Sequence, residues 1–491
     1  MPSTAESLYL KKEGEHKLNL DAFFMPNTVA VVGASREPRK FGHVIFKNFV
    51  ESEFKGKAFP VNPKVESILG FKTYPSVKEI PSELDLAVIA IPAPMVPGIV
   101  DECVSKDVKA AIIISGGFRE VGEKGEKLEL EITEKIKDKS LRIIGPNCIG
   151  VYDPANHVDT LFLPRYRLRR PKAGPIAFVS QSGAFGSAVL DWAASQDIGI
   201  SKFVSIGNKI DVDEVDLLNY LADDPLTKCV TVYVESISRG REFLKTASRV
   251  VKNKPLVVLK GGVTNEGAGA ALSHTGSLAG SAKVVAGAFQ QAGVIQAQTV
   301  DGLFDYARAL AYQPTPTDRK EIAIVTNGGG FGVISTDEAS KLGLQLAKFS
   351  PETIETLRGK LPDYSIVHNP LDLVGDADVE RYRFALNAVS SDPNVGIVLV
   401  IVLLQTSFIE SDVVDAITES QVTYGKPTIV CTIGGDFTQI LVKMLEENRI
   451  PAYTTPERAV NAINALIYYA EALEDMDRKE QLKNEQQSRT L

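Results

Sequence analysis

The chain has 491 residues, of which 44% are hydrophobic and 24% are charged, an ordinary balance for a globular protein. This length suggests about three domains. The formal net charge of −8 argues against non-specific binding to nucleic acid, which needs a basic surface. The four cysteines are widely separated, so we expect reduced thiols rather than a disulfide framework or a metal site. The N-terminus has no apolar core of signal-peptide length, and no run of 18 or more apolar residues could span a membrane, so we expect a cytoplasmic protein without membrane contact.

Residues 1–150 form the first predicted block, and a polar tail covers 1–20. Short β-branched runs alternate here with amphipathic stretches, which is typical of a parallel sheet buried on both faces. The runs predict strands at 28–32, 86–91, 110–114 and 141–144. A segment rich in prolines and basic residues, 153–175, has weak periodicity and indicates a crossing into the next block.

The second block, residues 151–312, and the third block, residues 320–472, continue the α/β pattern. Strands are expected in the second block at 176–179, 203–206, 230–234 and 256–259. A linker with two prolines precedes the third block, whose expected strands are 321–325, 396–403 and 427–432. We expect this block to end in a helix over 456–472, followed by a polar tail at 473–491.

The first predicted strand ends in the loop VAVVGASREPRKFG, which leads into a helix. Backbone N–H groups at such a helix start attract phosphate, and Arg36, Arg39 and Lys40 could pair with it. The loop departs from the full dinucleotide fingerprint, and VNPK at 61–64 stands where NAD-binding proteins place an acidic residue. We therefore favour a nucleotide other than NAD, with an ordinary strand-to-helix turn as the alternative.

Two later turns repeat this arrangement of a strand, small polar residues and a helix. In SQSGA, residues 180–184, the hydroxyls of Ser180 and Ser182 and the amides of Gly183 and Ala184 would lie at a positive helix end. In TNGGG, residues 326–330, consecutive glycines cost backbone entropy, which a closely approaching ligand would explain. The alternatives are a plain helix cap and a flexible turn.

A long loop of small residues, 261–281, follows the strand at 256–259 and carries His274. Long loops in compact domains are often functional, and a neutral imidazole can attack phosphorus and hold the phosphoryl group covalently. Glu235 ends the strand at 230–234 and would point into the ligand crevice, where it could orient that imidazole. An ordinary surface histidine and a surface glutamate are the alternatives.

In this order the motifs resemble the succinyl-CoA synthetase superfamily, most closely its archaeal-type ADP-forming acetate–CoA ligases. The matching stretches are GASREPRKFG, VNPK, IAIPAP, ISGGFREVGEKG, IGPNCIGV, VSQSGAFG, SIGNKIDVDEVDLL, YVES, SHTGSLAG, TNGGGFGV and NPLDL. The resemblance implies an α/β protein with an N-terminal dinucleotide-type (Rossmann-like) CoA-binding domain followed by two flavodoxin-like ligase domains. It also implies reversible conversion of acyl-CoA, phosphate and ADP to a carboxylic acid, CoA and ATP, through an acyl phosphate and phosphorylated His274 with Glu235 as its partner.

The resemblance also assigns binding residues. Coenzyme A would lie along Gly33, Ser35, Arg36, Lys40, Val61, Asn62, Lys64, Ile91, Pro92, Ser115, Gly116, Asn147 and Cys148. Phosphate would face the helix starts at Ser180, Gln181, Ser182, Gly183, Ala184, Asn327, Gly328, Gly329 and Gly330. No metal is expected on this chain.

The three blocks account for the whole chain and leave no counterpart of the ATP-grasp module that fused members of the superfamily carry. We therefore expect ADP/ATP and Mg²⁺ to bind a separate ATP-grasp β subunit, in an α₂β₂ heterotetramer. Two alternatives from other functional classes stay open, a CoA-binding regulatory protein without catalysis and an NAD(P)-linked oxidoreductase.

Overall fold

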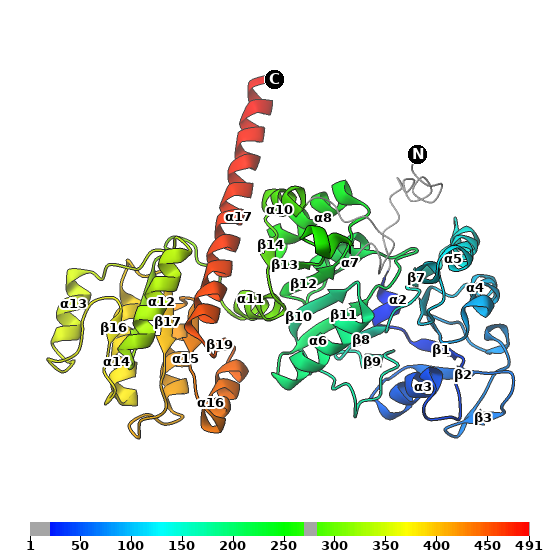
Figure 1. Ribbon diagram of the computed structural model, residues 1–491, viewed down its shortest axis with the longest axis horizontal. Coiled ribbons are helices and arrows are strands. Elements are labelled where there is room, and N and C mark those ends of the chain that lie inside the picture. The colour runs from blue at the N-terminus through cyan, green and yellow to red at the C-terminus, as the bar shows by residue number, and fades with distance from the viewer. Residues whose placement is uncertain (1–19, 270–281, 491) are drawn as a thin grey trace.

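The computed structural model describes residues 20–269 and 282–490. Its elements form three α/β units side by side, each built on its own mainly parallel sheet (Figure 1). The first unit is blue, the second green, and the third yellow and orange, so the units follow chain order. The α/β fold class predicted from the sequence is confirmed.

The first sheet is entirely parallel in the order β2-β1-β5-β6-β7. An isolated parallel bridge between Val61 and Tyr74 adds a rudimentary strand beyond β2. With that bridge, the strand order is that of the dinucleotide-binding folds. The strands are β1 (Thr28–Val32), β2 (Lys57–Val61), β5 (Leu86–Ile89), β6 (Ala110–Ile113) and β7 (Arg142–Ile144), and the main helices are α3 (Phe41–Glu51), α4 (Val96–Ser105) and α5 (Glu123–Ile136).

The second sheet has the order β14-β13-β12-β10-β11-β8-β9, in which only the short β8 and β9 are antiparallel. Its strands are β8 (Val151–Asp153), β9 (Val158–Asp159), β10 (Ala173–Ser180), β11 (Ile200–Ser205), β12 (Cys229–Val234), β13 (Leu256–Lys260) and β14 (Ile295–Ala297). Its helices are α6 (Gly183–Ser195), α7 (Glu214–Asp223), α8 (Gly240–Asn253), α10 (Ala282–Gln291) and α11 (Val300–Tyr312).

The third sheet is parallel in the order β16-β15-β17-β18-β19. Its first strand in the chain, β15, lies second from one edge, and β10 has the same place among the parallel strands of the second sheet. This order is the flavodoxin-like one. The strands are β15 (Ile322–Thr326), β16 (Leu371–Asp372), β17 (Ile397–Ile401), β18 (Thr428–Cys431) and β19 (Ala452–Tyr453). The helices are α12 (Gly329–Lys341), α13 (Pro351–Arg358), α14 (Val379–Ser391), α15 (Val413–Tyr424), α16 (Asp436–Glu447) and α17 (Pro456–Thr490).

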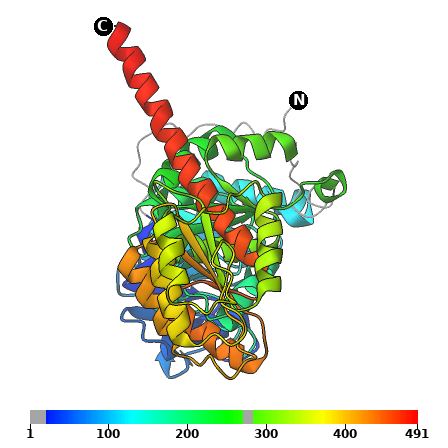
Figure 2. The same ribbon diagram turned by 90° about the vertical axis from the view of Figure 1, so that its left-hand side faces the viewer.

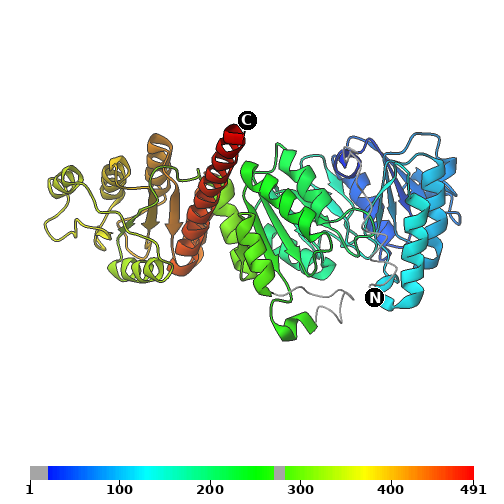
Figure 3. The same ribbon diagram turned by 90° about the horizontal axis from the view of Figure 1, so that it is seen from above.

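Helix α17 joins the second and third units. It packs against α11 and α12, and it lies between the two units when the molecule is seen from above (Figure 3). Its C-terminal part extends beyond both units (Figure 2). The helix expected at 456–472 thus continues to Thr490, because the polar tail consists mainly of good helix formers and contains neither glycine nor proline. No helix within 20–269 and 282–490 is long and apolar enough to cross a membrane.

Apolar packing makes the three units continuous. One core contains Val31 of β1, Val179 of β10 and Leu399 of β17, and so spans all three sheets. The remaining faces of the first and third sheets have cores of their own, represented by Ile89 and Val400. Because close-packed cores resist sliding, this arrangement holds the second unit in a fixed relation to both neighbours.

Candidate functional site

The carboxyl end of the second sheet is organised by a buried glutamine. Gln181 follows β10, and its Oε1 accepts hydrogen bonds from the backbone N–H groups of Glu235 (2.8 Å) and Ser236 (3.1 Å). Its Nε2 donates to the Ser236 hydroxyl at 3.2 Å. The Gln181 side chain therefore fastens the start of α6 to the end of β12. Its backbone N–H donates to the Tyr233 carbonyl at 3.0 Å, so the second hydrogen of Nε2 is the donor of Gln181 left for the phosphate contact expected from the sequence.

The N-terminus of α6 has free backbone donors. Ser182 caps the helix by accepting from the Phe185 N–H at 3.3 Å, and the buried Ser180 hydroxyl donates to the Ser182 carbonyl at 2.7 Å. The N–H groups of Gly183 and Ala184 have no acceptor among the described residues, and such unpaired amides carry the positive end of the helix dipole. Of the predicted phosphate-binding groups on this helix, these two amides are the best placed for an anion.

Glu235 is buried, with 7% of its surface exposed, at the end of β12. Its Oε1 accepts from the Tyr233 hydroxyl at 3.2 Å, while Oε2 has no hydrogen-bond partner among the described residues. Burial and the neighbouring Glu235 carboxylate raise the pKa of Tyr233 to about 12, which keeps that hydroxyl protonated as a donor. The Tyr233 ring also stacks on Phe185 of α6, with 3.9 Å between centroids. Glu235 thus has one fixed oxygen and one unused acceptor.

The loop that carries His274 starts beside Glu235. A Cβ added to Gly261 would lie 2.9 Å from the Tyr233 hydroxyl oxygen and 3.5 Å from Cγ of Glu235. The first loop residue therefore packs directly against this pair, and a larger side chain there would push it aside. His274 itself lies outside the described residues.

The N-terminus of α12 repeats the geometry of α6. The Asn327 side chain donates to the Leu403 carbonyl (3.0 Å) and accepts from the Leu403 N–H (2.9 Å), much as the Gln181 side chain accepts from the Glu235 N–H at the end of β12. The Thr326 hydroxyl donates to the Gly328 carbonyl at 3.1 Å, as Ser180 does to Ser182. Through this equivalence Leu403 occupies the position of Glu235, so the third unit retains the helix start but not the carboxylate.

The three glycines of this turn have different roles. A Cβ on Gly328 would collide with the Leu403 side chain, and one on Gly329 would lie 2.5 Å from Oδ2 of Asp372. A Cβ on Gly330 would meet nothing within 4 Å. Packing within the unit therefore explains Gly328 and Gly329. At Gly330 no neighbouring atom requires a glycine, so the backbone at the start of α12 is accessible there.

The first sheet gathers the residues assigned to coenzyme A at its carboxyl end. Gly33 follows β1 with a φ of +87° and donates its N–H to the Val61 carbonyl at 3.1 Å. A side chain at Gly33 would strike the Ala90 carbonyl, and one at Gly42 would strike the Gly33 carbonyl. These contacts bring the start of α3 close to the strand ends, where its uncapped N–H groups face the loop.

The other assigned residues follow the same five strands. The Asn62 side chain donates to the Ala34 carbonyl and accepts from the Lys64 N–H, both at 2.8 Å. The Ser115 hydroxyl donates to the Ile91 carbonyl, and the Ser115 carbonyl accepts from the Asn147 N–H at 2.9 Å. Because carboxyl ends of parallel strands meet at one edge, this edge brings together Ser35, Asn62, Lys64, Ile91, Pro92, Ser115, Gly116 and Asn147.

Three assigned side chains have other surroundings. Arg36 donates through Nε to the Ser67 carbonyl at 2.9 Å, and Lys40 is an exposed residue at the start of α3, so both remain at the loop surface. Cys148 is buried, with its sulfur 3.4 Å from the Ile113 carbonyl oxygen. Burial raises the pKa of the Cys148 thiol to about 12, and only the backbone of this residue is available to a ligand.

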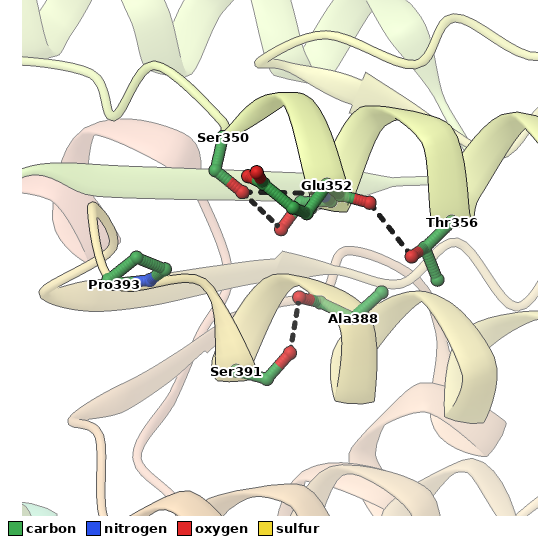
Figure 4. Close-up of a pocket in the computed structure, with 7 residues that line it drawn as sticks. Ser350, Glu352, Thr356, Ala388, Ser391 and Pro393 are labelled. Carbon is green, nitrogen blue, oxygen red and sulfur yellow. Dashed lines mark hydrogen bonds between the residues drawn. The ribbon is translucent and has the colours of Figure 1, made fainter.

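A pocket of about 370 Å³ lies elsewhere, between α13 and the end of α14, at the amino end of β17 (Figure 4). Its hydroxyl groups bond within the unit: Ser350 to Thr353 at 3.1 Å, Thr356 to the Glu352 carbonyl at 2.8 Å, and Ser391 to the Ala388 carbonyl at 2.9 Å. Ligands of open α/β sheets bind at the carboxyl ends of the strands, so this pocket is not part of the candidate site. The described residues contain no group of three or more His, Cys, Asp or Glu side chains placed to hold a metal.

Three family models match consecutive parts of the chain. Residues 27–154 match a CoA binding domain, 173–310 match a succinyl-CoA ligase like flavodoxin domain, and 322–476 match a ligase-CoA domain. Each matched region includes one of the three sheets, together with the groups described above at the carboxyl ends of its strands.

Similar proteins share nearly the whole chain. The ADP-forming acetate–CoA ligase II subunit alpha of Pyrococcus furiosus is 41% identical over 455 residues, which are 92% of this chain and 98% of that protein. The ADP-forming acetate–CoA ligase I of Archaeoglobus fulgidus is 42% identical over 451 residues, which are 92% of this chain but 64% of that protein. A solved structure of dinucleotide-forming acetyl-coenzyme A synthetase 1 from Ca. Korarchaeum cryptofilum, in complex with phosphate and ADP, superposes with a TM-score of 0.88 at 38% identity, covering 94% of this chain and 99% of that one. The chain therefore belongs to the family of ADP-forming acetate–CoA ligase α subunits.

Proposed function

We propose that this chain is the α subunit of an ADP-forming acyl-CoA synthetase and carries a phosphoryl group on His274. The overall reaction is the reversible conversion of acyl-CoA, phosphate and ADP to a carboxylic acid, CoA and ATP. The observation that carries the proposal is the unused Oε2 of buried Glu235, which lies beside the first residue of the His274 loop at the same sheet end as the start of α6. A buried carboxylate oxygen without a donor is costly, and an imidazole N–H would satisfy it.

Coenzyme A binds at the carboxyl end of the first sheet in this proposal. The α3 start and the Gly33 turn hold the phosphates, while Arg36 and Lys40 supply charge from the loop. The polar groups of Asn62, Ser115 and Asn147 line the same edge and are fixed by bonds to neighbouring strand ends. This fit agrees with the CoA binding domain matched at 27–154.

The chemistry has two transfers on this chain. A phosphate oxygen attacks the thioester carbonyl carbon, the C–S bond breaks, and CoA leaves as a thiolate that takes up a proton. A ring nitrogen of His274 then attacks phosphorus, and the carboxylic acid leaves as its carboxylate. Glu235 accepts a hydrogen bond from the other ring nitrogen and so holds one tautomer. The free amides at α6 and α12 stabilise the phosphoryl oxygens, because phosphoryl transfer depends mainly on positioning and electrostatics.

The last transfer, from His274 to ADP, takes place on a second subunit in this proposal. The Pyrococcus relative is named as a subunit, and the longer Archaeoglobus relative extends well beyond the region matched by this chain. We propose that an ATP-grasp β subunit binds ADP/ATP and Mg²⁺, in an α₂β₂ heterotetramer located in the cytoplasm. We further propose domain limits of 1–150, 151–312 and 320–472, with 473–491 as a tail.

The test uses the purified full chain, radiolabelled phosphate and a panel of short acyl-CoAs, with and without a candidate β subunit. The expected result is acid-labile, base-stable label on the chain, absent from the His274→Ala variant. The acyl-CoA that gives the fastest labelling identifies the acyl class. If neither mixture labels the chain while CoA still binds, the proposal is wrong and a CoA-binding regulatory protein is the better account. Binding of NAD(P) in place of CoA would favour the oxidoreductase alternative.

A further inference from the structure

Lys260 is the last residue of β13 and is buried, with 7% of its surface exposed. Its ammonium group donates to the Glu235 carbonyl at 2.7 Å and also to the Gly261 carbonyl. These two carbonyls belong to the residue that carries the free carboxylate oxygen and to the first residue of the His274 loop. No carboxylate among the described residues forms a hydrogen bond or ion pair with Lys260.

A buried ammonium group without an ion-pair partner is unfavourable, because burial removes its hydration. That burial lowers the pKa of Lys260, which the nearby Glu235 charge opposes. Lys209 adds a like charge, while its own ammonium is paired with Glu214 at 3.0 Å. The carboxyl end of the second sheet therefore contains two unfavourable groups. One is the Lys260 ammonium, which is bound only by two carbonyls, and the other is Oε2 of Glu235, which has no donor among the described residues. Such a costly arrangement is expected where geometry serves a reaction rather than stability.

We infer that Lys260 is a positioning residue for phosphoryl transfer. Its ammonium group links the ends of β12 and β13 and thereby fixes Glu235 relative to Gly261, the first residue of the His274 loop. This inference rests on the proposed function. Lys260 acts through Glu235 and does not touch the phosphoryl group. A small displacement of a positioned group is sufficient to slow such a step strongly.

The same strand offers a matched control. Lys254 precedes the amino end of β13 and donates to two backbone carbonyls, those of Leu221 (2.9 Å) and Asp224. Burial lowers its pKa as well. Lys254 thus shares the chemistry of Lys260 but lies at the opposite end of the strand from Glu235. Lys254 is only half-buried, so comparing Lys260→Met with Lys254→Met separates the loss of a lysine that binds two backbone carbonyls from the loss of this particular link.

The experiment measures the initial rate of His274 labelling in the complete α–β complex, together with the KM for phosphate and the affinity for CoA. We expect Lys260→Met to lower the maximal rate about 10- to 100-fold with CoA affinity unchanged, and Lys254→Met to stay within about twofold of wild type. In the Glu235→Gln background, Lys260→Met should lower the rate by less than about threefold further, because both changes remove one function.

Three results would overturn the inference: a wild-type rate in Lys260→Met, an equal loss in Lys254→Met, or a full additional loss in the Glu235→Gln background. If Lys260→Met does not fold, as judged by CoA binding and circular dichroism, Lys260→Gln is judged by the same criteria. Absence of label on the wild-type complex would refute the proposed function itself. Label on wild type combined with any of the three results would refute only the role of Lys260.

Discussion

The contact between the second and third units depends on a buried ion cluster around Arg308 of α11. Its guanidinium donates to Glu446 of α16 at 2.8 Å and to Asp305 at 2.9 Å, and it lies 4.7 Å from the ring centroid of Tyr453. Arg458 of α17 completes the cluster by binding Asp305 at 2.7 Å. Arg308→Met keeps most of the side-chain volume but leaves Glu446 buried without its cation.

Breaking a buried pair in this way costs about 3–5 kcal/mol, because one desolvated charge is left uncompensated. For a cooperative unit of the size of the second block this corresponds to a fall in Tm on the order of 10 °C. Trp192 is the single tryptophan of the chain and packs against Phe304 of α11 with 5.8 Å between ring centroids, so its fluorescence during urea unfolding reports on this region. Arg249→Met is the control, because Arg249 and Asp223 form an exposed pair and its loss should cost less than about 1 kcal/mol.

The loss should also depend on pH. Burial raises the pKa of Glu446, while Arg308 opposes that rise. Without Arg308 the folded-state pKa rises further above the unfolded value, so the folded protein gains stability as Glu446 becomes protonated. The destabilisation should therefore be largest near about pH 8 and smaller near about pH 5. A loss equal to that of Arg249→Met, or a loss that grows as pH falls, would refute this reasoning.

The remaining predictions concern single positions. Gly33→Ala should abolish CoA binding and lower the free energy of unfolding by about 1–3 kcal/mol, because Gly33 has a positive φ and a Cβ there would collide with the Ala90 carbonyl. Gly98→Ala in α4 has open space around it and should bind CoA normally. Calorimetric titration with CoA distinguishes the two variants, and normal binding by Gly33→Ala would count against the assigned site. Glu235→Gln should unfold at the same or a higher temperature than wild type while labelling His274 at least about 10-fold more slowly, and an unchanged labelling rate would contradict its role. The Cys148 thiol should not react with maleimide in the native chain near neutral pH, since burial raises its pKa to about 12, and rapid native labelling would show that the site is open.

The central strands could be predicted from the sequence because they are buried on both faces and rich in β-branched residues. β1 and β12 are examples in which the burial pattern is nearly continuous. The strands β9, β16 and β19 have two residues each and lie at or next to sheet edges, so they contain too little periodicity for any sequence pattern to reveal.

The small-residue turns were also evident in the sequence, but the roles of individual side chains were not. Gln181 and Asn327 lie in turns whose composition is typical of phosphate binding. Their side chains, however, form hydrogen bonds with strand ends that lie 54 and 76 residues away in the chain. Such long-range partners depend on strand order, which local patterns do not specify. Lys260 left one local signal, a charged residue closing the buried run LVVLK, that could have indicated a functional group at a strand end.

The most direct test of the central claim is to locate the phosphoryl group on the chain. Trypsin cleaves after Lys260 and Lys283 and releases residues 261–283, a peptide whose single histidine is His274. After incubation of the α–β complex with phosphate and the best acyl-CoA, mass spectrometry at alkaline pH should find this peptide heavier by one phosphoryl group, with fragment ions placing it on His274. A labelled chain in which the phosphoryl group lies on any other peptide would contradict the account.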